Sequence, residues 1–163
     1  MKRVIIVRHA KSSWDDASLP DFERPLNERG KHDAPMMAKR LRDRKVDIDA
    51  FITSPAKRAK RTATLFAKEY NIDKDDVILV DALYHAAPEE FYKAIEKAPN
   101  KAKTIALFSH NPGITDFVNT LTTTRVDDMP TCAVFAVKAP IENWSEFRQA
   151  AREFWFFDFP KSQ

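Results

Sequence analysis

The chain has 163 residues, of which 44% are hydrophobic and 31% are charged, and its formal net charge is +3. This length and balance are typical of one globular domain with a substantial core, and no apolar run is long enough to cross a bilayer. The mild positive excess does not by itself indicate nucleic acid. The apolar stretch near the N-terminus is too short for a signal peptide, so we expect a cytoplasmic protein. The single cysteine, Cys132, excludes an internal disulfide and is expected to be a buried small hydrophobe.

Apolar runs alternate with amphipathic stretches along the chain, without an obvious linker or repeat. Strands are predicted at 3–7, 49–53, 77–80, 104–108, 132–137 and 153–159. Each of the first four strands is followed by a stretch in which apolar residues recur at helical spacing, starting near Gly30, Ser54, Pro88 and Gly113. This alternation predicts one domain over 1–163, a three-layer α/β/α sandwich with a mostly parallel sheet. No helix is obvious between the last two strands, so one of them is expected to be an antiparallel edge strand.

Charged side chains follow several of the predicted strands. Arg8 and His9 come directly after the first strand, "SPAKRAKRTA" (54–63) follows the second, and "SHNPGIT" (109–115) follows the fourth. In open α/β sheets, ligands bind beyond the carboxyl ends of the strands. Two arginines and two histidines are therefore expected to meet at one edge of the sheet.

Two of these segments also contain the signals of a helix start. Ser54 is expected to be the N-cap and Pro55 the first helical residue, which places Arg58 near the positive end of the helix dipole. A cation is unfavourable there unless an anion is also present. Asn111 and Pro112 are expected to begin a helix in the same way just after His110, with Gly113 allowing close backbone approach.

Taken singly, each of these residues has a simpler explanation. A lone histidine is more often structural than catalytic, and an arginine at a strand end is usually an ion-pair partner. Their coincidence at three strand ends, beside two expected helix N-termini, favours an anion pocket, and phosphate is the anion that this combination suits best.

Four motifs in order, "VRHAKSSW", "DFERPLNERG", "SPAKRAKRTA" and "SHNPGIT", resemble the histidine phosphatase superfamily, whose fold is called phosphoglycerate-mutase-like. The short chain is most similar to the SixA-type phosphohistidine phosphatase branch. The resemblance implies that His9 is the nucleophile that becomes phosphorylated. It further implies that Arg8, Arg58 and His110 bind the phosphoryl oxygens, and that Asn111 shapes the loop around His110.

Other loop residues have less certain roles under this resemblance. Ser12 follows the nucleophile and is a candidate for binding phosphate, and Arg24 is a candidate rim contact. Trp14 is either a loop anchor, which is the interpretation we favour, or a wall of the pocket entrance. The loop carboxylates, of which Asp21 is one, are interpreted as solvated charges, because their spacing does not define a metal site.

The sequence departs from many superfamily members in the region after the third strand. There they carry a glutamate that protonates the leaving group, whereas "DALYHAAPEE" (81–90) offers Asp81, Tyr84 and His85 before any glutamate. His85 is therefore a candidate acid, or a rim residue with no role. A phosphohistidine substrate can bring its own proton, because free imidazole has a pKa of about 6.5. The departure thus favours phosphoramidate substrates and the SixA-type branch.

Three functions remain open from the sequence. The first is a phosphohistidine phosphatase acting on a protein, such as a histidine-phosphotransfer domain, and the second is a phosphatase for small phosphate monoesters. The third is a non-catalytic phosphate-binding module. No cofactor, metal, nucleic acid or membrane is expected in any of them, and nothing in the sequence requires more than a monomer.

Overall fold

The computed structural model describes residues 1–161, and its centre is a six-stranded sheet with the strand order β3-β2-β4-β1-β5-β6. The strands are short, and the central ones are the most buried. Their bounds are β1 Lys2–Arg8, β2 Ala50–Thr53, β3 Ile78–Leu79, β4 Thr104–Ser109, β5 Val134–Ala139 and β6 Glu153–Asp158.

The sheet is mostly parallel, as the alternation of strands and helices predicted. Strands β1 to β4 run in one direction, and β5 pairs antiparallel with both β1 and β6. The antiparallel strand, β5, therefore lies one position in from the edge, which β6 occupies, so the prediction of an antiparallel edge strand was wrong. The connection from β5 to β6 contains a short 3-10 helix but no α-helical crossover, and the two strands pair antiparallel.

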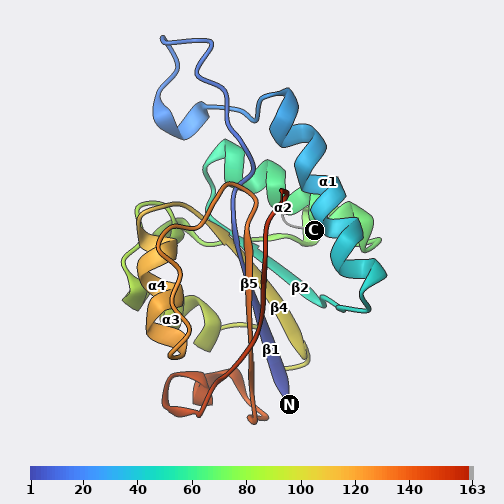
Figure 1. Cartoon of the computed structure of the whole chain (residues 1–163), viewed down its shortest axis with the longest axis vertical. Helices are drawn as coiled ribbons and strands as arrows, with labels where there is room; N and C mark the ends of the chain where they lie inside the picture. Colours follow the sequence, from blue (N-terminus) through green and yellow to red (C-terminus); the bar gives the residue numbers. More distant parts are fainter. Residues whose placement is uncertain (162–163) are drawn as a thin grey trace.

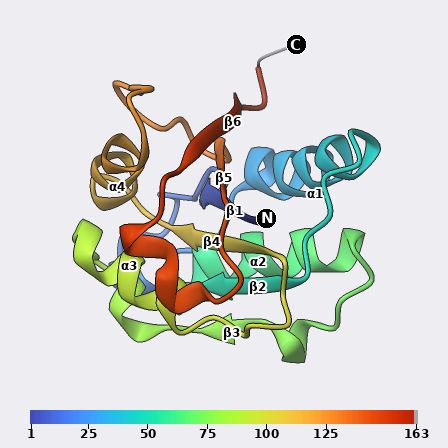
Figure 2. The ribbon, with the colours of Figure 1, turned by 90° about the horizontal axis from the view of Figure 1, so that it is seen from below.

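Helices cover both faces of the sheet, as predicted for three layers (Figures 1 and 2). Helices α1 (Glu28–Asp43) and α2 (Lys57–Glu69) pack side by side on one face. Helices α3 (Pro88–Glu96) and α4 (Gly113–Leu121) pack together on the other, where α3 also contacts a 3-10 helix formed by Trp144–Gln149. None of the helices in the described residues is long and apolar enough to cross a membrane.

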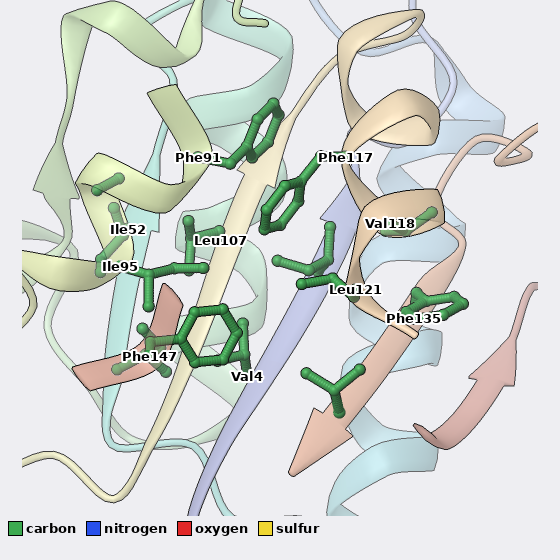
Figure 3. Close-up of a cluster of buried hydrophobic side chains, with 14 of the residues drawn as sticks. Val4, Ile52, Phe91, Ile95, Leu107, Phe117, Val118, Leu121, Phe135 and Phe147 are labelled. Carbon is green, nitrogen blue, oxygen red and sulfur yellow. The ribbon is translucent and has the colours of Figure 1, made fainter. Parts of the chain in front are cut away.

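The two faces of the sheet build two apolar clusters because successive strand residues point in opposite directions. In β1, Val4 and Ile6 face the cluster under α3 and α4, whereas Ile5 and Val7 face the cluster under α1 and α2. Figure 3 shows the first cluster, in which the rings of Phe91 and Phe117 stack with centroids 4.7 Å apart. These buried strands form a rigid support for whatever follows their carboxyl ends.

The connection between β1 and α1 is a long loop that rises beyond the carboxyl end of the sheet (Figure 1). It includes a short 3-10 helix, Asp21–Glu23. The loop is fixed at both ends, because the Ser13 N–H donates to the Pro25 carbonyl and the Asn27 N–H donates to the Lys11 carbonyl. It therefore forms one wall above the strand ends.

Candidate active site

The site lies where β1, β2 and β4 end. Parallel pairing places Arg8 of β1 opposite Ser109 of β4. The residues that follow, His9 and His110, therefore lie side by side at the carboxyl end of the sheet. Their ring centroids are 5.2 Å apart. An open pocket of about 420 Å³ lies over them and is lined by Arg8, His9, Lys11, Ser12, Trp14, Asp21, Arg24, Arg58, His85, His110, Asn111, Pro112 and Thr131. The structure thus brings together all of the site residues singled out from the sequence.

His9 is buried and held in one orientation. Its side-chain Nδ1 donates a hydrogen bond to the Ala10 carbonyl oxygen at 2.7 Å, while the Ala10 N–H donates to the Thr62 hydroxyl of α2 at 3.0 Å. Burial is the main cause that lowers the pKa of His9 to about 3, and the nearby cations Arg58 and Arg8 act in the same direction. With its proton on Nδ1, the neutral ring keeps the Nε2 lone pair free to act as a nucleophile.

His110 is also neutral in the free protein. Burial is the main cause that lowers its pKa to about 2, and the neighbouring His9 and Arg58 act in the same direction. Its Nε2 lies 2.8 Å from the Ser54 hydroxyl oxygen, and its buried Nδ1 has no hydrogen-bond partner in the described chain. A protonated His110, which would help to hold an anion, therefore requires the anion to be present first.

Arg8 and Arg58 supply fixed positive charge. The Arg8 Nη1 donates to the Met129 carbonyl at 2.8 Å, and the Arg58 Nη1 donates to the Asp21 carbonyl at 2.7 Å. Each guanidinium also has a buried Nε without a partner in the described chain. A buried donor without a partner costs free energy unless something else satisfies it. An anion in the pocket would remove that cost.

The Asp21 side chain is 43% exposed, as expected for a loop charge, but it also forms ion pairs that the sequence did not indicate. Its carboxylate accepts hydrogen bonds from Arg58 at 3.0 Å, from Tyr84 at 2.7 Å and from Arg24 at 3.2 Å. Burial alone would raise its pKa, but the bonds from Tyr84, Arg58 and Arg24 outweigh burial and hold it well below the ordinary value. The sequence signal that could have found Asp21 is its position three residues before Arg24 in a loop that follows the first strand.

Arg24 and Ser12 interact directly. The Arg24 Nη1 donates to the Ser12 hydroxyl at 2.7 Å, and the Arg24 guanidinium lies 3.5 Å from the centre of the Trp14 ring. Trp14 is 75% exposed and lines the pocket, which fits the alternative of an entrance wall better than that of a loop anchor. It covers one face of Arg24 at the rim of the pocket, an arrangement that stabilises the cation.

The two expected N-caps use their side chains differently. Helix α2 begins at Lys57, after Ala56, and α4 begins at Gly113, after Pro112. The Ser54 hydroxyl accepts from the Ala56 N–H but also contacts His110. Asn111 donates to the Asp128 carboxylate and to the Met129 carbonyl, the same oxygen that accepts from Arg8. Both side chains thus connect site elements instead of capping a helix.

The two glycines of the chain lie where backbones touch near the pocket. A Cβ on Gly30, in the first turn of α1, would run into the carbonyl oxygen of Lys11. A Cβ on Gly113, at the start of α4, would run into the carbonyl oxygen of Ala86. The absence of a side chain therefore allows both helices to hold the loops of the pocket closely, as expected for Gly113.

The remaining candidate, His85, is exposed and lies at the rim, with its ring centroid 4.0 Å from that of Tyr84. Cys132 is fully buried in the second apolar cluster, and burial raises the pKa of its thiol. Within residues 1–161, no group of three or more His, Cys, Asp or Glu side chains is placed to hold a metal ion. Three arginines against one carboxylate leave the pocket with the electrostatics of an anion site.

Comparison with known proteins defines the class to which this fold and pocket belong. The sequence pattern of the histidine phosphatase superfamily (branch 1) matches residues 4–84, which include three of the four motifs. The chain belongs to the histidine phosphatase superfamily.

Solved structures extend the likeness over nearly the whole chain. The SixA protein of Agrobacterium tumefaciens is 24% identical, with a TM-score of 0.81 over 98% of each chain. A protein histidine phosphatase SixA complexed with tungstate is 23% identical, with a TM-score of 0.80 over 97% of each chain. At these identities the likeness shows a shared fold. A curated relative, phosphoserine phosphatase 1 of Hydrogenobacter thermophilus, is 30% identical over 118 residues, which cover 63% of this chain and 54% of that protein.

Proposed function

We propose that the protein is a metal-independent phosphatase that removes the phosphoryl group from phosphohistidine in a protein, through a phosphorylated His9. One observation carries this proposal. The Nδ1 proton of His9 is committed to the Ala10 carbonyl, so the neutral ring presents Nε2 beside Arg8, Arg58 and His110. This is the form of histidine that attacks phosphorus.

The reaction proceeds in two displacements. In the first, a bond forms between His9 Nε2 and phosphorus while the bond from phosphorus to the substrate nitrogen breaks, and the substrate imidazole leaves with that electron pair. In the second, a water oxygen attacks phosphorus, the His9 nitrogen leaves with its pair, and the water proton is released. Arg8 and Arg58 stabilise the charge that spreads over the equatorial oxygens, as fixed donors do in a buried site.

The character of the pocket supports phosphohistidine as the substrate. Asp21 is the one carboxylate among the described residues that line the pocket, and its hydrogen bonds keep it ionised. It is therefore a poor donor of a proton to an alkoxide leaving group. A phosphohistidine substrate protonated on its other nitrogen leaves as neutral imidazole and requires no enzymic acid. The shared fold of the SixA proteins supports the same assignment.

A second candidate function is hydrolysis of small phosphate monoesters. The identity to phosphoserine phosphatase 1 of Hydrogenobacter thermophilus favours it. In that case the exposed ring of His85, at the rim of the same pocket, is the candidate acid.

One experiment tests the proposal and separates it from a binding module. The protein is mixed with a phosphohistidine-bearing protein in the presence of a chelator, the reaction is quenched in alkali, and phosphate on His9 is measured by mass spectrometry. We expect labelling of the wild type, none in His9→Ala, and release of inorganic phosphate. Equal labelling of His9→Ala would refute the nucleophile, and binding without release would indicate a module. Faster turnover of phosphoserine or sugar phosphates than of phosphohistidine would establish the second candidate instead.

A further inference from the structure

Helix α2 presents an unusual distribution of charge on its outer surface. It carries Lys57, Arg58, Lys60, Arg61 and Lys68 against one acidic residue, Glu69, and its first turn has no acidic residue. Arg58 turns into the active site and pairs with Asp21. The exposed side chains of Lys57, Lys60 and Arg61 have no ion pair in the described part of the chain.

This placement opposes the helix dipole. The N-terminal turn of a helix carries partial positive charge, so acidic residues stabilise it and basic residues destabilise it. A nearby carboxylate would compensate this charge, but no carboxylate in the described part of the chain forms an ion pair with these cations. A negatively charged partner would therefore stabilise this end of α2.

The cations border a groove, which we call the basic groove. It has a volume of about 510 Å³ and is lined by Lys57, Lys60, Arg61, Thr64, Lys74, Asp75, Val77 and Leu79. Lys74 has no ion pair among residues 1–161 either, and Leu79 is 46% exposed. The groove thus combines four cations, against the single carboxylate of Asp75, with an apolar contact. Leu79 belongs to β3, which is the last strand of the sheet and pairs on one side only with β2.

The basic groove and the active-site pocket border the same turn of α2. Lys57 at the groove directly precedes Arg58 at the pocket, and both lie in the first turn of the same helix. Figure 2 shows α2 over the part of the sheet that ends in β3. A protein whose phosphoryl group reaches His9 therefore has its neighbouring surface within reach of the groove.

We propose that the basic groove docks an acidic segment of the phosphorylated protein substrate, and that it selects protein substrates over free phosphohistidine. The proposal rests on the function proposed above. An acidic protein segment matches both features of the groove, because carboxylates pair with the lysines while an apolar side chain covers Leu79. A single-stranded nucleic acid matches it less well, because the described lining has no aromatic ring on which bases could stack.

The test compares two double variants that change the net charge equally. Lys60→Glu/Arg61→Glu reverses the groove, whereas Lys101→Glu/Lys103→Glu reverses two exposed lysines before β4, at the opposite end of the strands from the site. The substrates are a histidine-phosphotransfer domain of net negative charge, phosphorylated on histidine with phosphoramidate, and free phosphohistidine. Thermal unfolding checks that both variants fold, and the groove variant should unfold at a temperature no lower than the wild type, since it removes cations from the positive helix end.

We expect kcat/KM of the groove variant to fall about tenfold on the phosphorylated domain at low salt, with the difference shrinking at high salt. Its kcat/KM on free phosphohistidine should stay within about twofold of the wild type, and the control variant should match the wild type on both substrates. An equal loss on both substrates, or none on the domain, would overturn the docking proposal. So would retained turnover of the domain with lost binding of a single-stranded oligonucleotide.

The failure of the proposed function gives a different result. If the wild type hydrolyses neither phosphohistidine substrate, the chemistry assigned to the pocket is wrong. Docking is then tested by measuring the binding of the unphosphorylated domain by calorimetry. The groove variant should bind it more weakly than the wild type and the control variant do. Equal binding by the wild type and the groove variant would then reject the groove as well.

Discussion

The charge state of His9 sets the pH range over which it can attack a phosphoryl group. A histidine with a pKa of about 6.5 is about 90% protonated at pH 5.5 and would lose most of its nucleophilic form. Burial lowers the pKa of His9 to about 3, so it stays neutral at that pH. We predict that kcat/KM, which reports the free enzyme, shows no acid limb near pH 6.5 on an aryl phosphate. A loss of about tenfold by pH 5.5 would show that His9 titrates normally.

Asp21 acts at the same scale by holding other side chains in place. It fixes the Arg58 guanidinium through both its carboxylate and its carbonyl, and it accepts from Tyr84. We predict that Asp21→Ala lowers kcat by about tenfold, because an arginine that is free to move stabilises the transition state less. Asp16→Ala is the matched control, since the exposed Asp16 carboxylate in the same loop bonds to Ser18 only. Equal kcat in the two variants would remove Asp21 from its positioning role.

The residues that sequence reasoning placed correctly are those fixed by backbone geometry. Arg8, His9 and His110 directly follow strands whose apolar character is plain, and parallel pairing brings such ends together. The orientation of Asp21 and Trp14 depends on Arg58 and Arg24, which are distant in sequence or lie across an irregular loop. No periodicity reports such contacts, so the sequence did not indicate the ion pairs of Asp21 or the position of Trp14 over Arg24.

At the scale of elements, the starts of α1 and α4 are fitted closely to the loops of the pocket. We predict that Gly30→Ala destabilises the protein by roughly 1–3 kcal/mol, because the new methyl group overlaps the Lys11 carbonyl oxygen and backbone must shift. Thermal unfolding measures this as a lower Tm. Activity should fall as well, since Lys11 lies two residues beyond His9 in the same loop.

Lys31→Ala is the matched control for this prediction, because Lys31 is the next residue of α1 and is exposed, with one long contact to Glu28. It should change the free energy of unfolding by less than about 0.5 kcal/mol. If Gly30→Ala were as stable and as active as Lys31→Ala, the close approach of α1 to the loop would not require glycine at position 30.

The helix starts also show where local sequence rules gave the wrong detail. Ser54 and Asn111 precede prolines, a pattern typical of an N-cap, yet α2 begins two residues later and α4 one residue later than this pattern predicts. Hydrogen bonds to partners on other elements, His110 for Ser54 and the 128–129 segment for Asn111, compete with local capping. The side chains at the pocket follow the tertiary contacts, which the local sequence does not encode.

For the whole molecule, the layers could be predicted because continuous apolar runs alternate with stretches of helical period, whereas the strand order could not be predicted. The order depends on which apolar faces match after the helices have packed, and the chain places β4 between β1 and β2. This crossover is what brings the first and fourth strand ends together and so creates the pocket. The two-histidine site is thus a property of the complete sheet.

The same two buried histidines couple the stability of the whole molecule to pH. In the unfolded chain a histidine takes up a proton below a pKa of about 6.5. In the folded protein His9 and His110 do so only near pH 3 and pH 2. The unfolded state therefore binds more protons as the pH falls from about 6.5, and the free energy of unfolding decreases by roughly 1 kcal/mol for each histidine by pH 5.5.

We predict that the wild type loses stability over this interval and that His9→Gln loses less. The variant lacks one of the two linked protons, so its free energy of unfolding should fall with acidification by a slope that is smaller by about one proton. Urea unfolding at a series of pH values measures both slopes, and contributions from carboxylates are common to the two proteins and cancel. Parallel curves would mean that His9 is protonated equally in the folded and unfolded states, and the lowered pKa that keeps the nucleophile neutral in mild acid would be excluded.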